Sequence, residues 1–269
     1  MKSIASSLLL AVALYSCAPN NVTIDNSLGK FFDSTGTVGC FALYDNGTNQ
    51  FTIYNLPRYR DSSFLPASTF KIVNSLIGLQ TGRISSDSMV IPWDGVVRRV
   101  KEWNQDLSMY RAFRYSAVPY YQEVARRIGR DTMQFWLDSL SYGTHTIGPR
   151  IDSFWLDNSL KIKPDEELGL VRKLYFDQLP FFKSYQETVK RAMLFEDNTA
   201  YRLSYKTGWG YNERGHSVGW VVGYVEENNH PYFFVLNLES ADPAIDMAAV
   251  RMGVLKGILR QLGFLQGKM

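Results

Sequence analysis

The chain has 269 residues, of which 45% are hydrophobic and 14% aromatic, which is enough to bury a large core without the help of disulfides or metals. The formal net charge is +3, and basic residues are mixed with acidic ones along the sequence, so we expect no nucleic-acid partner. Three histidines, His145, His216 and His230, stand in turn-like sequence without the spacing of metal ligands, so we expect no metal site.

Residues 1–17, MKSIASSLLLAVALYSC, have the layout of a secretory signal peptide: one lysine, a short apolar run and then small residues. We therefore expect an exported, periplasmic protein whose mature domain covers residues 18–269. LYSC before Ala18 resembles a bacterial lipobox, which would make Cys17 a lipidated first residue attached to a membrane. AVA at residues 11–13 offers a plain signal peptidase site instead, and we favour the lipoprotein. In either case we expect no disulfide between Cys17 and Cys40, whose apolar neighbours predict a buried small hydrophobe.

The first elements of the mature chain are two strands and a set of helices. Residues 36–55 contain two β-rich runs around DNGTN, where Asp45, Asn46 and Gly47 favour a hairpin turn. Residues 64–82, FLPASTFKIVNSLIGLQTG, predict a helix that is apolar on nearly all sides and ends at Gly82. Two amphipathic helices follow at residues 119–129 and 131–140.

The helix at residues 131–140 carries a start signal, with Asp131 as N-cap and Gln134 at the reciprocal capping position. Near the C-terminus, three further strands are expected in meander order, over residues 201–210, 216–227 and 231–240. The last element is a long helix over residues 242–263, with Asp242 as N-cap and Pro243 at the first helical position.

Together these elements predict an α+β fold. Five strands, from about residues 36–55 and 200–240, can form one antiparallel sheet. The chain between them, about residues 66–195, must then be an inserted helical lobe, and the C-terminal helix can cover the sheet. The expected fold is a five-stranded antiparallel sheet flanked by helices.

Lys71 is a charged residue type in a helix that is expected to be buried, so its position needs an explanation. Ser68 and Lys71 are three residues apart at the start of this helix, and residues at this spacing share a helix face. Serine alone is a weak nucleophile, whereas a lysine that burial keeps neutral can act as its base. The free N–H groups of the first turn can stabilise developing negative charge. The same spacing also fits a Ser68 that only caps the helix and a Lys71 whose ammonium reaches solvent.

Two further motifs favour the interpretation of Ser68 and Lys71 as a nucleophile and its base. SAV, Ser116 to Val118, stands just before a helix, and its hydroxyl could pass a proton to a leaving nitrogen. KTG, Lys206 to Gly208, stands on the first strand of the C-terminal meander, where a lysine and a threonine can point into a cleft and glycine lets a substrate approach closely. Each triplet is common by chance, but their ordered combination is much rarer and favours a serine acyl-transfer site.

These motifs, together with YGT at 142–144, SFWL at 153–156 and VGW at 218–220, resemble the class D serine β-lactamases, the oxacillinases, over essentially the whole mature chain. Val118 matches class D, because class A enzymes and most penicillin-binding proteins have asparagine at this place in the second motif. Thr144 departs from the family's YGN, which leaves open the local bonds that the asparagine makes. The resemblance implies the fold shared by serine β-lactamases and penicillin-binding transpeptidases, with residues 18–269 as the catalytic domain.

The resemblance also implies a mechanism and a substrate class, the β-lactam ring of penicillin-type antibiotics, and hence antibiotic resistance. Ser68 would form an acyl-enzyme, and Lys71 would carry a carbamate (N6-carboxylysine) that acts as general base. Carbon dioxide is the source of the carbamate, and no other cofactor is implied. The further roles are a carbamate pocket of Phe70, Val118, Trp155 and Leu156, an oxyanion hole of the Ser68 and Trp209 backbone N–H groups, proton transfer and local charge at Ser116 and Lys206, and substrate binding by Thr207, Gly208 and Arg251.

Two other functions fit the same motifs. A penicillin-binding or β-lactam-sensing protein would be acylated without turnover, but such sensors hang from a transmembrane helix bundle, which this sequence lacks. A catalytically inactive lipoprotein could use the fold as a binding module, although intact Ser68, Lys71, Ser116 and Lys206 argue against it. The sequence leaves open which penicillins, cephalosporins or carbapenems are turned over, and whether the protein is a monomer or a homodimer.

Overall fold

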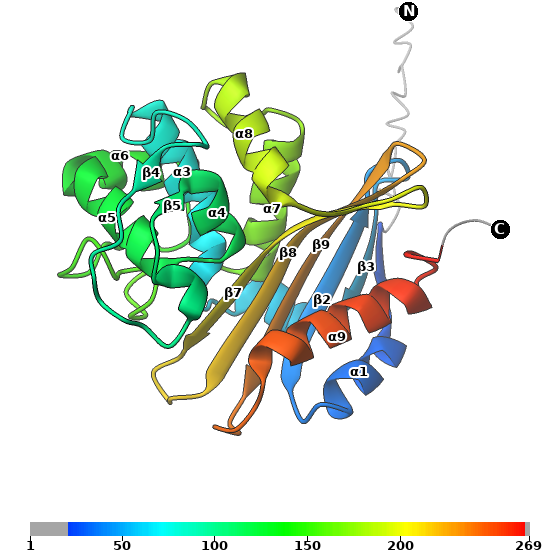
Figure 1. Cartoon of the computed structure of the whole chain (residues 1–269). Helices are drawn as coiled ribbons and strands as arrows, with labels where there is room; N and C mark the ends of the chain where they lie inside the picture. The colour runs from blue at the N-terminus through cyan, green and yellow to red at the C-terminus, as the bar shows by residue number, and fades with distance from the viewer. Residues whose placement is uncertain (1–20, 267–269) are drawn as a thin grey trace, which may run out of the picture.

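The computed structural model describes residues 21–266, which form a sheet with helices on both faces and a helical lobe beside it (Figure 1). The signal peptide and Cys17 lie outside the described residues, so both predictions about them stay predictions. Cys40, in contrast, is free and fully buried, which confirms it as a small core residue. Burial raises the pKa of its thiol to about 12.

The sheet contains the five predicted strands and two short ones. Its order is β1-β3-β2-β9-β8-β7-β6, and all neighbours are antiparallel except β1 and β3. The predicted strands are β2 (Val38–Asp45), β3 (Gln50–Tyr54), β7 (Arg202–Tyr211), β8 (Ser217–Glu227) and β9 (His230–Ser240). The count of five was too low, because the edge strands β1 (Val22–Ile24) and β6 (Leu194–Asp197) have three and four residues and too little length for an alternating pattern.

The inserted lobe lies between β3 and β6, and most of its helices stand to one side of the sheet (Figure 1). Helix α7 packs on β8 and β9, while α9 and α1 cover the opposite face of the sheet. The helices are α1 (Gly29–Asp33), α2 (Leu56–Asp61), α3 (Lys71–Gln80), α4 (Met109–Arg114), α5 (Val118–Ile128), α6 (Arg130–Leu140), α7 (Pro164–Tyr175), α8 (Lys183–Met193) and α9 (Met247–Gln261). Three 3-10 turns, η1 (Asn26–Leu28), η2 (Ala67–Phe70) and η3 (Lys101–Trp103), and a small ribbon of β4 (Val90–Ile91) and β5 (Leu107–Ser108) complete the fold.

Strand alternation divides the core into two clusters, one on each face of the sheet. On β8, Trp220, Val222 and Tyr224 belong to the cluster shared with the lobe, whereas Val221 and Val225 belong to the cluster under α9. Successive side chains of a strand point to opposite faces, so β8, which is buried on both sides, has no polar residue between positions 218 and 225. This sheet is therefore the rigid floor on which both the lobe and α9 are placed.

Two predicted helix starts were wrong. Helix α9 begins at Met247 and is capped by Asp246, which accepts from the Ala249 N–H; the chain uses Asp242 earlier, in a turn in which its carboxylate accepts from the Ala244 N–H. Helix α6 begins at Arg130 without a side-chain cap, because α5 ends two residues before it at Ile128 and Gly129 serves both helices.

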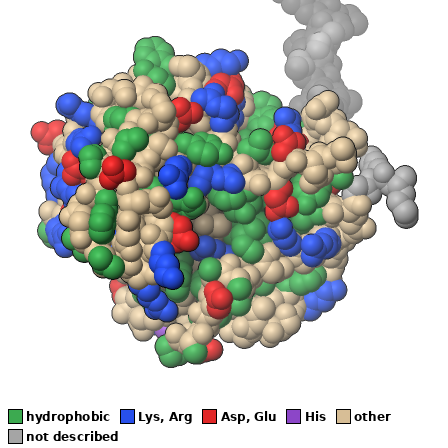
Figure 2. Space-filling view, in the orientation of Figure 1, with side chains coloured by type: hydrophobic (Ala, Val, Ile, Leu, Met, Phe, Trp, Pro, Cys, Tyr) green, Lys and Arg blue, Asp and Glu red, His purple; other side chains and the backbone are tan. Residues whose placement is uncertain are grey.

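Asp131 consequently lies inside the first turn of α6. The Gln134 amide donates to Asp138 and to the His145 carbonyl, and not to a capping residue. No helix within residues 21–266 is long and apolar enough to span a membrane. Figure 2 shows basic and acidic side chains interspersed on the face in view.

The histidines pair with carboxylates in three separate places: His145 with Asp138, His216 with Glu239 and His230 with Asp45. Over the described range, the structure brings no three histidine, cysteine or acidic side chains together in a metal-binding arrangement.

Candidate active site

The first motif places a serine hydroxyl against a buried amine. Ser68 lies in the turn η2, and Lys71 opens α3 directly after it. The Lys71 side chain is fully buried, and its Nζ lies 2.7 Å from Ser68 Oγ. The N-cap of α3 is Phe70, without a side-chain bond. Ser68 therefore does not cap the helix and Lys71 does not reach solvent, which removes the simpler interpretation of this motif.

Burial prepares Lys71 to act as a base. It lowers the pKa of the amine from its usual value to about 7, because the low-dielectric interior disfavours the ammonium. At neutral pH a large share of the amine is thus unprotonated, and the 2.7 Å contact can then run from the serine hydroxyl to the nitrogen. Such a pair can remove the proton of Ser68 as its oxygen attacks a carbonyl.

The turn that carries Ser68 has an unusual backbone. Ala67 has φ +50°, a left-handed conformation that costs a residue with a Cβ about 1–3 kcal/mol. Two contacts hold it there: the Ala67 N–H donates to the Trp155 carbonyl at 3.0 Å, and the Thr69 hydroxyl lies 2.8 Å from the Pro66 carbonyl. Backbone strain persists where the surrounding contacts enforce one conformation, and here those contacts fix the backbone just before Ser68.

The second and third motifs meet across the lobe and the sheet. Lys206 on β7 is buried, and its Nζ donates to Ser116 Oγ at 2.8 Å and to the Thr207 carbonyl at 3.0 Å. Ser116 itself has φ +54°. Burial, and then the nearby charges of Lys71 and Arg251, lower the pKa of Lys206 well below its usual range. The two serine–lysine pairs thus lie close enough to influence each other's protonation.

Strand β7 presents a free edge beside this group. Its pairing with β6 ends at Ser204, whereas its pairing with β8 continues to Tyr211. Gly208 lies so close to η2 that a Cβ added there would stand 2.9 Å from the Pro66 carbonyl oxygen, so this position requires glycine. Trp209 follows, half-exposed, with its indole donating to Ser217 Oγ. An unpaired strand edge of this kind can receive the backbone-like amide of a substrate.

Thr207 and Arg251 lie at the other face of β7. Because neighbouring side chains alternate, the half-buried Thr207 leaves the strand on the face opposite Lys206. Arg251 on α9 donates from Nη1 to the Gly208 carbonyl at 2.6 Å, while its buried Nε has no partner. Burial lowers the pKa of this guanidinium to about 10, and it remains charged at neutral pH.

Of the residues predicted to form the carbamate pocket, Phe70 and Trp155 lie together at the start of α3. Phe70 is fully buried and stacks on Trp155 with ring centroids 5.4 Å apart, and Val118 and Leu156 are half-buried. The Trp155 Nε1–H is buried and has no acceptor among the described residues. An orphaned buried donor is costly, so this N–H fits an ionised oxygen group that the protein chain itself does not supply.

Two features escaped the interpretation of the sequence. Glu167 is fully buried and contacts Thr69. Its position in the sequence could have predicted this burial, because it shares one face of α7 with Pro164, Leu168 and Val171.

Thr144, the departure from the YGN motif, accepts a bond from the Lys161 N–H through its hydroxyl.

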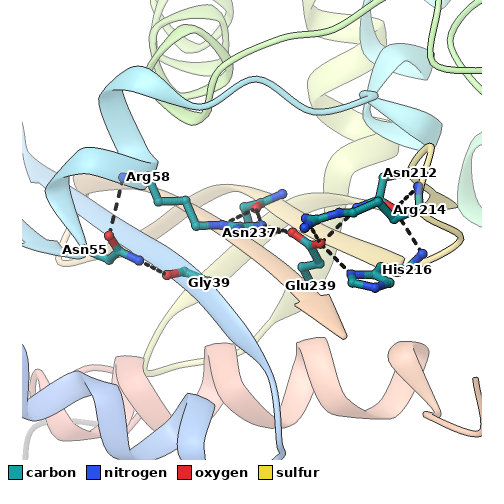
Figure 3. Close-up of polar contacts among 8 residues, drawn as sticks. All are labelled: Gly39, Asn55, Arg58, Asn212, Arg214, His216, Asn237 and Glu239. Carbon is teal, nitrogen blue, oxygen red and sulfur yellow. Dashed lines mark hydrogen bonds and ion pairs between the residues drawn. The ribbon is translucent and has the colours of Figure 1, made fainter. Parts of the chain in front are cut away.

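The second missed feature is a polar cluster that ties the β7–β8 turn to β9 (Figure 3). The buried Glu239 carboxylate binds four side chains at once, those of Arg58, Asn212, Arg214 and His216. Arg58 also donates to the Asn237 side chain. Since the turn directly follows the free edge of β7, this cluster holds the strand that carries Lys206 and Trp209.

Taken together, a serine with a neutral lysine, a second serine–lysine pair facing it and a free strand edge define a serine acyl-transfer enzyme. The family model of the penicillin binding protein transpeptidase domain matches residues 39–259. β-Lactamase OXA-5 of Pseudomonas aeruginosa is 36% identical over 265 residues, which cover 96% of this chain and 99% of that protein.

Among solved structures, a class D β-lactamase from Nostoc superposes with a TM-score of 0.84 at 39% identity, covering 90% of this chain and all of that one. The regulatory protein BlaR1 of Bacillus licheniformis is 34% identical over 224 residues, but the match covers 37% of its length. The chain therefore belongs to the class D serine β-lactamases.

Proposed function

We propose that the protein hydrolyses the β-lactam ring of penicillin-type antibiotics through an acyl-enzyme on Ser68, with carbamylated Lys71 as general base, and so confers resistance. The observation that carries the proposal is the buried Lys71 amine, 2.7 Å from Ser68 Oγ and with its pKa lowered to about 7. A neutral amine is what carbon dioxide requires to form a carbamate, and the orphaned Trp155 N–H supports a place for it. When present, the carbamate supplies an anionic base.

Ser68 and Ser116 act in different steps of acylation. Ser68 Oγ forms a bond to the lactam carbonyl carbon as its proton passes to the base at Lys71. The oxygen of the tetrahedral intermediate lies at the backbone N–H groups of Ser68 and Trp209, which stabilise its charge. The C–N bond then breaks as Ser116 donates its proton to the lactam nitrogen, and the proton held by the base at Lys71 replaces it, which restores both Ser116 and the base. The buried Lys206 at 2.8 Å holds the Ser116 hydroxyl in place.

Deacylation needs water and the same base. The base at Lys71 takes a proton from a water molecule as the water oxygen attacks the ester carbonyl. The C–O bond to Ser68 then breaks, and the base returns the proton to Ser68 Oγ as the hydrolysed product leaves. Thr207 and Arg251 bind the substrate carboxylate at the outer side of β7, and Gly208 lets this strand lie close to the turn η2 that carries Ser68. Arg251 fits this role because its guanidinium is held against the Gly208 carbonyl and stays charged.

A time course by intact-protein mass spectrometry, combined with hydrolysis of a penicillin and a chromogenic cephalosporin, tests the proposal. We expect many turnovers per enzyme molecule and a transient acyl adduct on Ser68. An adduct that persists for hours without product would instead identify a β-lactam sensor or binding protein, and no adduct at any concentration would refute both.

We further propose that the protein is exported to the periplasm and attached to a membrane through lipidated Cys17. The LYSC sequence supports this, and the lipid label described in the Discussion tests it. The carbamate aside, the proposed reaction uses no cofactor.

A further inference from the structure

Behind the nucleophile lies a buried carboxyl group to which the proposed reaction assigns no role. Glu167 on α7 is 0% exposed. Its Oε1 is 2.6 Å from the hydroxyl oxygen of Thr69, the residue after Ser68, and 3.0 Å from the hydroxyl oxygen of Tyr142. Its Oε2 is buried and has no partner. The carboxyl group thus contacts the turn η2 through Thr69.

Glu167 has no basic partner in the part of the chain that the structure describes. None of the ion pairs formed within residues 21–266 includes Glu167, and the charge that acts on it comes from Glu166, which has the same sign. Burial raises the pKa of Glu167 to about 7 against the bonds from Thr69 and Tyr142, which lower it. The ionisable side chains of the other elements near α7 are engaged elsewhere, Arg58 with Glu239, Lys190 with Asp177, Glu226 with Tyr175 and Lys71 with Ser68.

The protonation state of Glu167 decides where the single hydroxyl proton of Thr69 goes. Thr69 Oγ1 lies within hydrogen-bond distance of both Glu167 Oε1 and the Pro66 carbonyl, at 2.6 and 2.8 Å. A protonated carboxyl donates to Thr69, which then donates to Pro66, so that one chain of bonds spans the turn. An ionised carboxylate can only accept, so it competes with the Pro66 carbonyl for the Thr69 hydroxyl proton. The carbonyl then keeps the longer bond from the Thr69 N–H, at 3.2 Å, but not the bond from the hydroxyl.

Pro66 connects this chain to the active site. Its carbonyl is the group that approaches Gly208 on β7, and it directly precedes the strained Ala67 and the nucleophile. We propose that Glu167 is a positioning residue that, as a neutral carboxylic acid, locks the Ser68 turn against β7, and that its ionisation slows acylation of Ser68. This inference rests on the proposed function of Ser68.

Glu167→Gln tests the proposal, because glutamine can donate to Thr69 at every pH and cannot ionise. The matched control is Glu227→Gln, since Glu227 is at the far end of β8, is not among the charges that act on Glu167, and its bond from the Leu265 N–H can be accepted by an amide oxygen. For each protein we would measure the second-order rate of Ser68 acylation from pH 5.5 to 9. The ratio of Glu167→Gln to wild type should be near one below pH 6 and rise by up to about tenfold above pH 8, the size of one hydrogen bond, while the control ratio stays flat.

A ratio that is constant with pH would overturn the proposal, as would a Glu167 that is already ionised at pH 5.5. The second point is read from ¹³C-carboxyl NMR, in which the resonance missing from Glu167→Gln identifies the residue. If the wild type is not acylated by any β-lactam, the proposed function fails, but the inference is still tested: the same pH ratio is then measured for labelling of Ser68 by a fluorophosphonate. Thr69→Val, which removes the shared hydroxyl, should abolish the difference between wild type and Glu167→Gln.

Discussion

Replacing Trp155 by phenylalanine should weaken the carbamate on Lys71 without changing the Ser68 nucleophile. Phenylalanine preserves an aromatic ring that can still stack on Phe70, 5.4 Å away, but removes the buried N–H that has no acceptor in the protein. A hydrogen bond to a charged group contributes roughly 1.5–3 kcal/mol. The affinity of Lys71 for carbon dioxide should therefore fall by about 10- to 150-fold, and deacylation should slow because its base is absent from most molecules.

The assay is uptake of labelled carbon dioxide together with hydrolysis of a penicillin, each with and without added bicarbonate. Bicarbonate should restore part of the rate of Trp155→Phe and change the wild type little at neutral pH. Both activities should fall as pH drops below about 7, because the Lys71 amine, whose pKa burial lowers to about 7, is then protonated and cannot react. Trp155→Ala should show the same defect more strongly, since it also opens the pocket to water.

Trp136→Phe is the matched control, because Trp136 is a half-buried tryptophan that stacks on Phe181, away from the motifs. It should keep wild-type carbon dioxide uptake. A wild-type enzyme that is fully active with no carbamate would show that Lys71 works as a plain amine base. Unchanged carbon dioxide affinity in Trp155→Phe would show that the orphaned indole N–H has no part in holding the carbamate.

Three further predictions concern the nucleophile, the polar cluster and the N-terminus. Ser68→Ala should abolish both hydrolysis and formation of the acyl adduct. Lys71→Ala should stop turnover but slowly accumulate the adduct, which mass spectrometry detects. Turnover by Ser68→Ala would disprove the assignment of Ser68 as the nucleophile. Burial alone would raise the pKa of Glu239, but the bond from His216 and the charge of Arg58 lower it below its usual value, so this carboxylate stabilises the fold above about pH 4.5 and loses that effect as pH falls through its folded-state pKa. Glu239→Gln should thus lower the free energy of unfolding by roughly 1.5–3 kcal/mol at pH 7 and by little near pH 3. Denaturant unfolding at the two pH values measures this, and an equal loss of stability at pH 7 and pH 3 would contradict it. Cys17→Ser should abolish incorporation of a radioactive fatty acid and release the protein from membranes; an unlabelled wild type would exclude the lipoprotein.

Much of the architecture could be predicted from local patterns. Runs of β-forming residues next to turn residues were sufficient for β2, β3, β7, β8 and β9, because each of these strands has five or more residues. The three-residue β1 and four-residue β6 carry no such pattern; they are strands because a longer neighbour supplies their hydrogen bonds. The start of α9 also could not be predicted from the local sequence, since Asp242 and Asp246 are both suitable N-cap residues. The direction in which the chain leaves β9 determines which of them caps the helix.

For the site, the ordered combination of the three motifs favoured serine acyl transfer, because the spacing of Ser68 and Lys71 alone also fitted a helix cap. The apolar helix predicted a buried lysine, but only the tertiary structure decided how completely Lys71 is buried and hence that its pKa falls to about 7, since residues far away in the sequence complete the burial. The contact of Lys206 with Ser116 likewise joins residues 90 positions apart. Glu167, 98 positions from Thr69, looks in the sequence like one of three acidic residues in the first turn of a helix. Its chemistry comes from the face of α7 that the fold turns inward, where water cannot solvate a charge.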